Sequence, residues 1–242
     1  MDRRTTPRYE AESVSVFLAS REMNWLAHLL LSEPTPAFRL GGILPDLVSA
    51  PLLAGMPSEF QRGIQRHRQI DAYTDSHAIF RRSVQRLNPP FRRFGGIIMD
   101  VFYDHFLSRD WQTFSGIPLP EFVSEFYASF ESHRADIPLD AYARLRQMQA
   151  GDWLCSYGDI SGVAQALQGI SSRLRRPVDL ALSISVLEHD YHSLQTDFAA
   201  FFPELLTYVT PKSNATGKPG DRASLQSALP ESERGFEQND DA

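Results

Sequence analysis

The spacing of apolar side chains is the feature that most limits what this chain can fold into. In the stretch 89–111, large apolar residues recur every three or four positions, and the stretch 118–137 repeats the pattern through Phe122, Phe126 and Phe130. Such spacing predicts amphipathic or buried helices. Alternating segments joined by Gly-Asn turns, which would predict β-hairpins, do not occur. The sequence therefore predicts an all-α protein, a single-domain helical bundle.

Other helices can be placed by composition and by their boundary residues. We expect one at 23–32, where nearly every residue is apolar, and one at 58–77 with Ser58 as its N-cap. We expect a single long helix at 177–209, with a proline in its first turn. The stretch 41–53 contains Gly and Pro, and it predicts a short helix or turn.

The chain divides into three parts by composition. It has 242 residues, of which 42% are hydrophobic and 22% charged, as in ordinary globular proteins with a sizeable core. Residues 1–22 show no clear period, and residues 211–242 are polar and rich in Gly, Pro and Ser. We predict a disordered N-terminal extension (1–22), a helical domain (23–210) and a disordered tail (211–242).

Cysteine usage and hydropathy favour a cytoplasmic protein. Cys155 is the only cysteine, so an intramolecular disulfide is impossible, which fits a reducing compartment. We find no apolar run of about 18 residues and expect no membrane span. The apolar patch within residues 1–22 is too short, and its flank too acidic, for a secretory signal.

Positive charge is concentrated in one stretch. The net charge is -6, yet residues 60–93 hold eight Arg and only two Asp. Such a patch favours an acidic or phosphate-bearing partner, although a solvated helix surface explains it equally well. Nucleic acid is not expected, because a wider basic surface with interleaved aromatics is missing. The densest part of the stretch comprises Arg81, Arg82, Arg86, Arg92 and Arg93.

The segment HRQIDAYTDSH (67–77) carries an unusual set of ionisable residues. His67, Asp71 and Asp75 follow one another at intervals of four, which places them on one face of a helix. A solvated face more often uses Glu and Lys, which have better helix propensity. The segment therefore predicts a site.

Further His and Asp residues lie within otherwise apolar segments. His28 lies in MNWLAHLLL and Asp46 in GGILPDLV. In MDVFYDHFL, Asp100 and Asp104 share a helix face and His105 follows. Burying carboxylates among apolar residues is costly unless they are paired or bind a cation.

Imidazole and carboxylate groups on several helices suit a divalent metal such as manganese, iron, nickel or zinc. A metal of this kind can lower the pKa of a water molecule and present hydroxide to a phosphate ester. The alternative is a set of buried His–Asp pairs and Arg–Asp salt bridges that only organise the bundle. The residues alone leave both interpretations open.

Five motifs, in order over residues 23–209, resemble the acyl carrier protein phosphodiesterase family, also called acyl carrier protein hydrolyase. They are MNWLAHLLLS, GGILPDLV, GIQRHRQIDAYTDSH, RRFGGIIMDVFYDHFLSRDW and YHSLQTDFAAFFPEL. The resemblance implies a divergent all-α relative of the HD-type metal phosphohydrolases. It implies hydrolysis of the phosphodiester that joins 4′-phosphopantetheine to a serine of acyl carrier protein, with a divalent cation, typically manganese.

The resemblance also assigns residues. It implies catalytic roles for Asp46, His67 and Asp71, and makes Arg68 a phosphate clamp or a partner for a ligand carboxylate. Gly42 departs from the family pattern, which usually has Asn there, and this puts the nearby hydrogen bonding in question. The implied metal ligands lie among His28, Asp46, His67, Asp71, Asp104 and His105.

The resemblance implies which partner the basic patch would bind. Acyl carrier proteins are acidic around the modified serine, so we expect the five Arg to form a docking surface for the holo-carrier. Two alternatives stay open: an HD-like phosphohydrolase acting on a nucleotide or another small phosphoester, and a non-catalytic helical binding protein. Gly42 is the one hint of the latter, and the sequence leaves the oligomeric state open.

Overall fold

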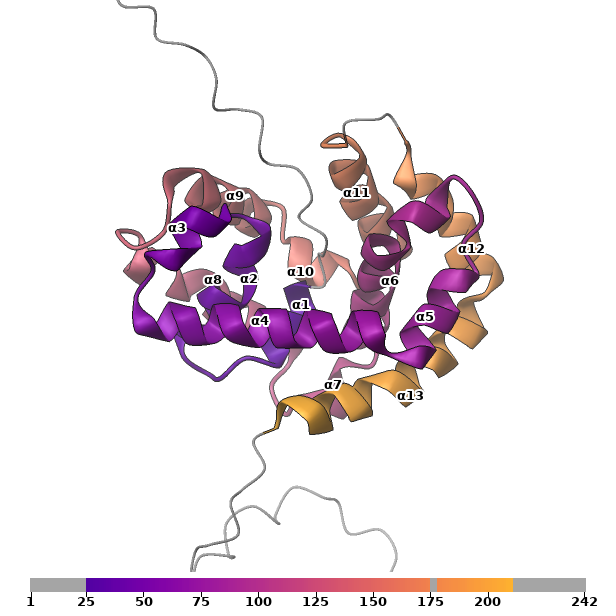
Figure 1. Ribbon diagram of the computed structural model, residues 1–242, viewed down its shortest axis with the longest axis horizontal. Helices are drawn as coiled ribbons and strands as arrows, with labels where there is room; N and C mark the ends of the chain where they lie inside the picture. The colour runs from indigo at the N-terminus through magenta and orange to yellow at the C-terminus, as the bar shows by residue number, and fades with distance from the viewer. Residues whose placement is uncertain (1–24, 175–177, 211–242) are drawn as a thin grey trace, which may run out of the picture. The chain divides into compact units, whose positions relative to one another are not determined.

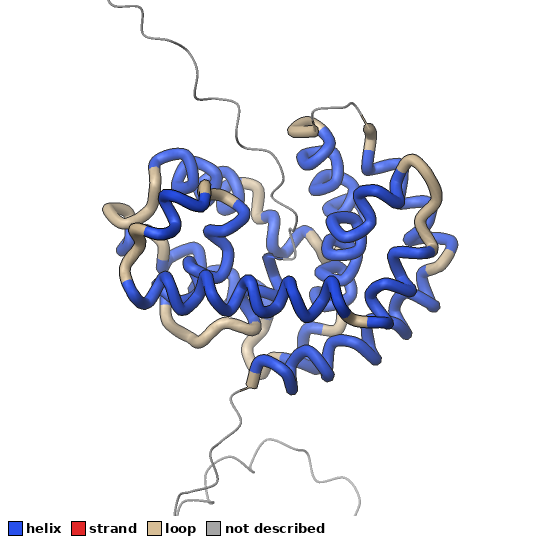
Figure 2. The backbone as a smooth tube through the Cα atoms, in the orientation of Figure 1, coloured by secondary structure: helices blue, strands red, loops and turns tan. Residues whose placement is uncertain are grey.

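The computed structural model describes residues 25–174 and 178–210, so the predictions for 1–22 and 211–242 lie outside the described residues. Within these ranges every regular element is a helix, which confirms the all-α prediction (Figure 2). None of the helices in the described ranges is long and apolar enough to cross a membrane.

Thirteen α-helices and four short 3-10 helices make up the described part (Figure 1). The α-helices of the first half are α1 (Trp25–Leu30), α2 (Pro36–Ile43), α3 (Ala50–Ala54), α4 (Ser58–Ser76), α5 (Ala78–Gln85), α6 (Gly95–Arg109) and α7 (Trp111–Phe114). Those of the second half are α8 (Leu119–Ser129), α9 (Leu139–Ala150), α10 (Trp153–Ser156), α11 (Ile160–Ser171), α12 (Ile184–His189) and α13 (Tyr191–Val209). The 3-10 helices are η1 (Leu44–Asp46), η2 (Phe91–Phe94), η3 (Glu131–His133) and η4 (Leu180–Ser183).

Helix α6 is the central helix of the core. Every residue from Ile98 to Leu107 is buried, because α1, α5, α11 and α13 all pack against this helix. A helix that is apolar on all sides is expected to be buried in this way. The polar residues Asp100, Asp104 and His105 are therefore carried into the interior by the helix that contains them.

Helices α2 and α4 pack with their backbones in contact. A Cβ atom on Gly41 would lie 2.2 Å from the carbonyl oxygen of Phe60, and one on Gly63 would lie 2.2 Å from that of Phe38. Only glycine allows so close an approach. Thr35 caps α2 by accepting a hydrogen bond from the Phe38 amide. The backbone contact at Gly41 and Gly63 fixes the end of α2, and the η1 turn that follows it, against the middle of α4.

Helix α4 links two groups of helices. Its first half packs on α2, and its last turns contact α5 and α13, as Figure 1 shows. Arg66 reinforces this arrangement, since its Nη1 donates a hydrogen bond of 2.8 Å to the Val209 carbonyl at the end of α13.

Several predicted element boundaries were wrong. The described part of 177–209 is not one helix: it divides into η4, α12 and α13, with a break at Asp190. Asp is a poor residue for a helix interior because it competes for backbone bonds, and it occupies a cap here. The N-cap of α4 is Pro57 rather than Ser58. The helices predicted at 89–111 and 118–137 are shorter, and each has a 3-10 turn at one end.

Candidate metal centre

Helix α4 supplies the first two side chains of the site. His67 and Asp71 are four residues apart, and Nε2 of His67 lies 3.0 Å from Oδ2 of Asp71. The His67 side chain is almost fully buried, whereas that of Asp71 is 20% exposed. The shared helix face predicted from the sequence therefore brings these two residues together, with Asp71 on the solvent side.

Helix α1 adds His28 from its apolar run. Its Nε2 lies 3.1 Å from the other carboxylate oxygen of Asp71, and its ring stacks on that of His67 with centroids 4.1 Å apart. One donor atom from each of the three residues falls within 4.8 Å of the others. The three atoms could hold a single metal ion.

Asp46, from η1, lies at the edge of this cluster. Its Oδ1 is 3.7 Å from Nε2 of His67, and its Oδ2 accepts a hydrogen bond of 2.8 Å from the indole nitrogen of Trp25. The side chain is 4% exposed. A buried carboxylate oriented by an indole N–H in this way can act as a ligand or can position one.

The ring of His67 is oriented by backbone. Its Nδ1 donates to the Gly42 carbonyl at 2.8 Å, so Nε2 faces the carboxylates. Histidines that bind metals commonly donate their second ring N–H in this manner. Burial alone would lower the pKa of His67, but the bond to Asp71 and the charge of Asp46 outweigh it, and the pKa is raised. Because position 42 contributes its carbonyl, this bond does not depend on the side chain there.

His28 is held neutral. Burial, and then the neighbouring His67, lower its pKa to about 4 against the opposing effect of Asp71. Its Nδ1 is buried and makes no hydrogen bond within the part of the chain that the structure describes. A buried neutral imidazole with Nε2 directed at a carboxylate is suited to hold a cation between the two.

Asp100 is a further carboxyl group beside the cluster. It is buried on α6, and burial together with the carboxylates of Asp71, Asp104, Asp75 and Asp46 raises its pKa well above the ordinary value. So many acids near one another in the interior require a counter-charge or protons. A divalent cation beside His28, His67 and Asp71 fits this requirement.

The structure does not bring Asp104 and His105 into this cluster. Both oxygens of Asp104 accept backbone hydrogen bonds, from Leu26 at 2.9 Å and Ala27 at 3.0 Å, so this carboxylate caps α1. In His105, Nδ1 donates to the Tyr157 carbonyl and Nε2 accepts from the Tyr191 hydroxyl, at 2.8 and 2.9 Å. The polar atoms of Asp104 and His105 therefore form hydrogen bonds that join α6 to other parts of the bundle.

Three other residues singled out in the sequence lie on the periphery. Arg68 is exposed on α4, one position beyond the buried His67. Asp75 is exposed as well. His77 accepts a hydrogen bond from the Ile79 amide and so caps α5.

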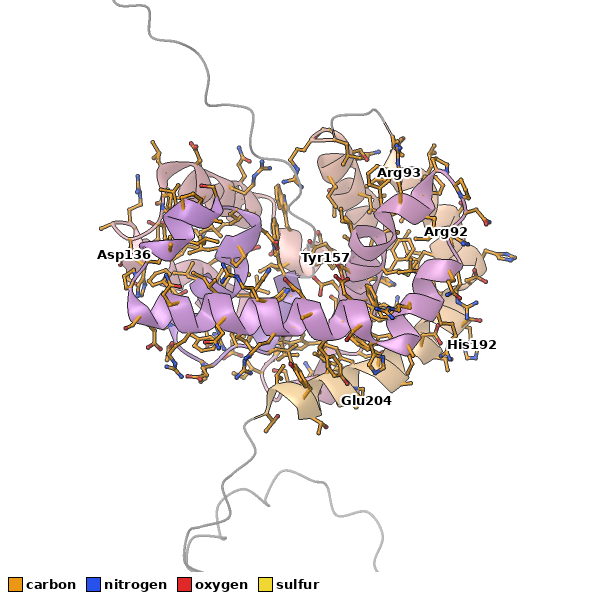
Figure 3. The ribbon with its side chains drawn as sticks, in the orientation of Figure 1. Arg92, Arg93, Asp136, Tyr157, His192 and Glu204 are labelled. Atoms are coloured by element: carbon orange, nitrogen blue, oxygen red, sulfur yellow. The ribbon has the colours of Figure 1, made fainter. Side chains whose placement is uncertain are left out.

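The arginines of the basic stretch differ in their contacts. The guanidinium groups of Arg82 and Arg86 both contact the buried Asp197. Arg92 donates to two backbone carbonyls, and Arg93 lies over the ring of Phe94. Figure 3 shows both of these last side chains at the molecular surface.

Three residues near the cluster were missed in the sequence. Trp25 holds Asp46, and Arg173 acts on Asp46 electrostatically. Tyr157, labelled in Figure 3, is buried, and burial followed by the charge of Asp104 raises its pKa. Local sequence carries no signal for these contacts, since each joins segments far apart in the chain.

Comparisons with known proteins agree on one family. The pattern of the family described as "Acyl carrier protein phosphodiesterase" matches residues 23–205. Proteins named acyl carrier protein phosphodiesterase are similar to this chain: that of Yersinia pestis is 30% identical over 191 residues, covering 78% of this chain and 99% of its own length. That of Klebsiella pneumoniae is 32% identical over 192 residues, with the same coverage of both chains. No solved structure matches the chain.

Proposed function

The chain belongs to the acyl carrier protein phosphodiesterase family, and from this premise we propose that it hydrolyses holo-acyl carrier protein to the apo form. The bond broken is the phosphodiester between 4′-phosphopantetheine and the carrier serine. The relatives carry this activity in their names, and they align with this chain over almost their whole length. The relation to HD-type phosphohydrolases stays a prediction.

One observation supports the chemistry most directly: the convergence of His28, His67 and Asp71. Two imidazoles and a carboxylate, with Asp46 and Asp100 close by, form a mixed nitrogen and oxygen donor set. Such a set suits a divalent cation, and we propose manganese. When bound, the cation would supply Lewis-acid chemistry, stabilising charge on the phosphodiester and activating water.

The protein's own side chains have distinct roles in this proposal. His28 and His67 hold the cation, and Asp71 both holds it and faces the substrate, because it alone of the three is partly exposed. Asp46 is kept in position by Trp25. Arg68 is a candidate for contact with the phosphodiester from the exposed face of α4.

We propose that the carrier docks on the part of the basic stretch that Asp197 does not neutralise. An acidic carrier requires positive charge that is not already compensated within the protein. Of the five arginines in the densest part of the stretch, Arg82 and Arg86 are held by Asp197, and the other three, Arg81, Arg92 and Arg93, are the arginines proposed for docking. The lone Cys155 and the acidic carrier substrate together favour a cytoplasmic site of action.

Mass spectrometry of the carrier tests the proposed function. Purified protein is incubated with holo-acyl carrier protein and Mn²⁺, and the carrier should lose one phosphopantetheinyl group. His67→Ala should abolish this conversion, whereas His192→Ala, on the exposed surface of α13, should not. If a folded, manganese-loaded protein leaves the holo-carrier intact, the proposed function is wrong.

A further inference from the structure

A narrow pocket lies between α9, α10 and α11. It has a volume of about 110 Å³, and its walls are mainly apolar. Trp153 and Tyr157 line it with aromatic side chains, and the small residues Gly162, Ala166 and Gly169 line it from α11. A Cβ on Gly162 would lie 2.0 Å from the Ser156 carbonyl oxygen, so α10 and α11 are in backbone contact beside the pocket. Walls of this kind suit a slender chain rather than a broad ring system.

Two arginines line the same pocket. Arg144 comes from α9 and Arg173 from the turn after α11. Burial, and then the charge of Arg144, lower the pKa of Arg173, which means that the two guanidinium groups are close enough to repel each other. Two guanidinium groups that line one pocket give it positive charge, which favours an anionic group such as a phosphate.

The pocket adjoins the metal centre. Trp153 stacks on Trp25 with ring centroids 6.2 Å apart, and Trp25 donates its indole hydrogen bond to Asp46. Arg173 and Tyr157 both interact electrostatically with Asp46. The pocket therefore lies on the side of the cluster where Asp46 is. A ligand that extends from this side of the cluster into the pocket would pass the arginines that line it.

We propose that this pocket receives the pantetheine arm of the substrate, with Arg144 and Arg173 attracting its phosphate end. The inference rests on the proposed function for the identity of the arm. The arm is a slender chain with two amides and a thiol at its far end, and its phosphate end carries a hydroxyl and a carbon with two methyl groups. A chain of this kind matches an apolar pocket that is lined by two guanidinium groups. The pocket would then give the enzyme its preference for the holo-carrier over other phosphodiesters.

Gly169 provides a variant that adds bulk at the mouth of the pocket without disturbing the fold. Gly169 is exposed where it lines the pocket, and a Cβ at this position meets no atom within 4 Å, so a leucine side chain is accommodated there without a clash. Gln168→Leu is the matched control, because Gln168 is exposed on the same helix and does not line the pocket. Both changes place leucine in a helix, where it is well tolerated.

Calorimetry with pantetheine, which lacks the phosphate, tests the pocket on metal-free protein. The wild type and Gln168→Leu should bind it alike, and Gly169→Leu should bind it about tenfold or more weakly. Arg144→Gln should weaken 4′-phosphopantetheine and leave pantetheine unchanged. The pocket assignment is overturned if wild-type protein does not bind pantetheine, or if Gly169→Leu binds as tightly as wild type. An equal loss in both leucine variants would overturn it too.

A second measurement separates the pocket from the proposed function. Wild-type protein and Gln168→Leu should bind holo-carrier more tightly than apo-carrier, and Gly169→Leu should lose this difference. If pantetheine binds but the holo-carrier is never cleaved, the proposed function fails and the pocket stands. If the holo-carrier is cleaved with an unchanged KM by Gly169→Leu, the pocket fails and the function stands.

Discussion

At the scale of single residues, two carboxyl groups one turn apart on α6 have different partners and therefore different roles. Asp104 is satisfied by the amides of Leu26 and Ala27, so it holds α1 in place. Asp100 lies among the other acids. Its pKa is raised, mainly because it is buried and also because of the charges of these acids. Because both share one helix face, spacing alone could not tell them apart: the difference depends on where the start of α1 docks. His67 and Asp71, in contrast, share a helix and could be paired from the sequence.

Substitution of these two acids should therefore have different effects. Asp104→Ala leaves two buried amides without an acceptor and should lower the free energy of unfolding by about 3 kcal/mol. Asp100→Asn replaces a carboxyl group whose raised pKa favours the neutral form, so stability should be nearly unchanged, but the loss of a carboxylate beside the cluster should weaken binding of Mn²⁺. Urea denaturation and metal titration of the two proteins measure the effects. A loss of metal with Asp104→Ala at full stability would contradict the assignment.

His105 should make stability depend on pH. Burial lowers its pKa below that of an unfolded-state histidine. As pH falls through about 6.5, the unfolded chain therefore takes up a proton that the folded state does not, and folding stability is lost. His105→Gln should make the stability of metal-free protein fall less steeply as the pH is lowered through this range. His192→Gln, at the surface position labelled in Figure 3, is the control and should keep the wild-type slope.

At the scale of helices, the glycine contact between α2 and α4 positions the site. It brings the Gly42 carbonyl to Nδ1 of His67 and places η1, with Asp46, next to α4. The long helices α4 and α6 were predictable because their apolar periods are clear over many residues. Short elements such as α2 were not, because their boundaries depend on a cap and on packing against a distant helix.

Gly63→Ala should damage both stability and metal binding. The added methyl group would meet the backbone oxygen of Phe38, so the helices must separate, at a cost of about 3 kcal/mol. His67 would then lose its bond to Gly42, and affinity for Mn²⁺ should fall. In Gly55→Ala, where the nearest atom would be 3.8 Å away, stability should change by about 0.5 kcal/mol at most. Equal stability of the two variants in denaturation would refute the close-contact argument.

At the scale of the whole molecule, the candidate ligands come from segments that meet only in the folded chain. His28 is on α1, Asp46 on η1, His67 and Asp71 on α4, and Asp100 on α6. A cation held by several of them binds the folded state and not the unfolded one. Binding at this site is therefore coupled to the stability of the entire helical domain.

Manganese should raise the melting temperature accordingly. At a free concentration about one hundred times the dissociation constant, binding adds about 2.7 kcal/mol. For a domain of this size the corresponding rise is about 5 to 10 °C. Calorimetry with and without a chelator measures it, and His67→Ala should show no rise. A rise of the same size in His67→Ala would mean that manganese binds elsewhere.

Charge reversal should separate docking arginines from structural ones. Arg93→Glu should raise KM for the holo-carrier about fivefold and weaken its salt dependence, with little effect on kcat or on a small phosphodiester. Arg82→Glu should lower stability instead, because the buried Asp197 loses one of its two arginine partners and meets a second carboxylate in its place. Steady-state kinetics with both substrates and thermal melts decide between the roles. Equal losses on both substrates with Arg93→Glu would argue against docking.

The stacked pair of Trp25 and Trp153 has an optical consequence. Their rings are nearly parallel, at 3°, and close enough for the two indoles to share an excited state. One indole is hydrogen-bonded to Asp46 and the other lines the pocket beside α11. The remaining tryptophan, Trp111, is bonded to the Ile117 carbonyl and supplies a separate background. The protein thus has a fluorophore of its own between its two sites, and its emission can follow events at either one without an attached dye.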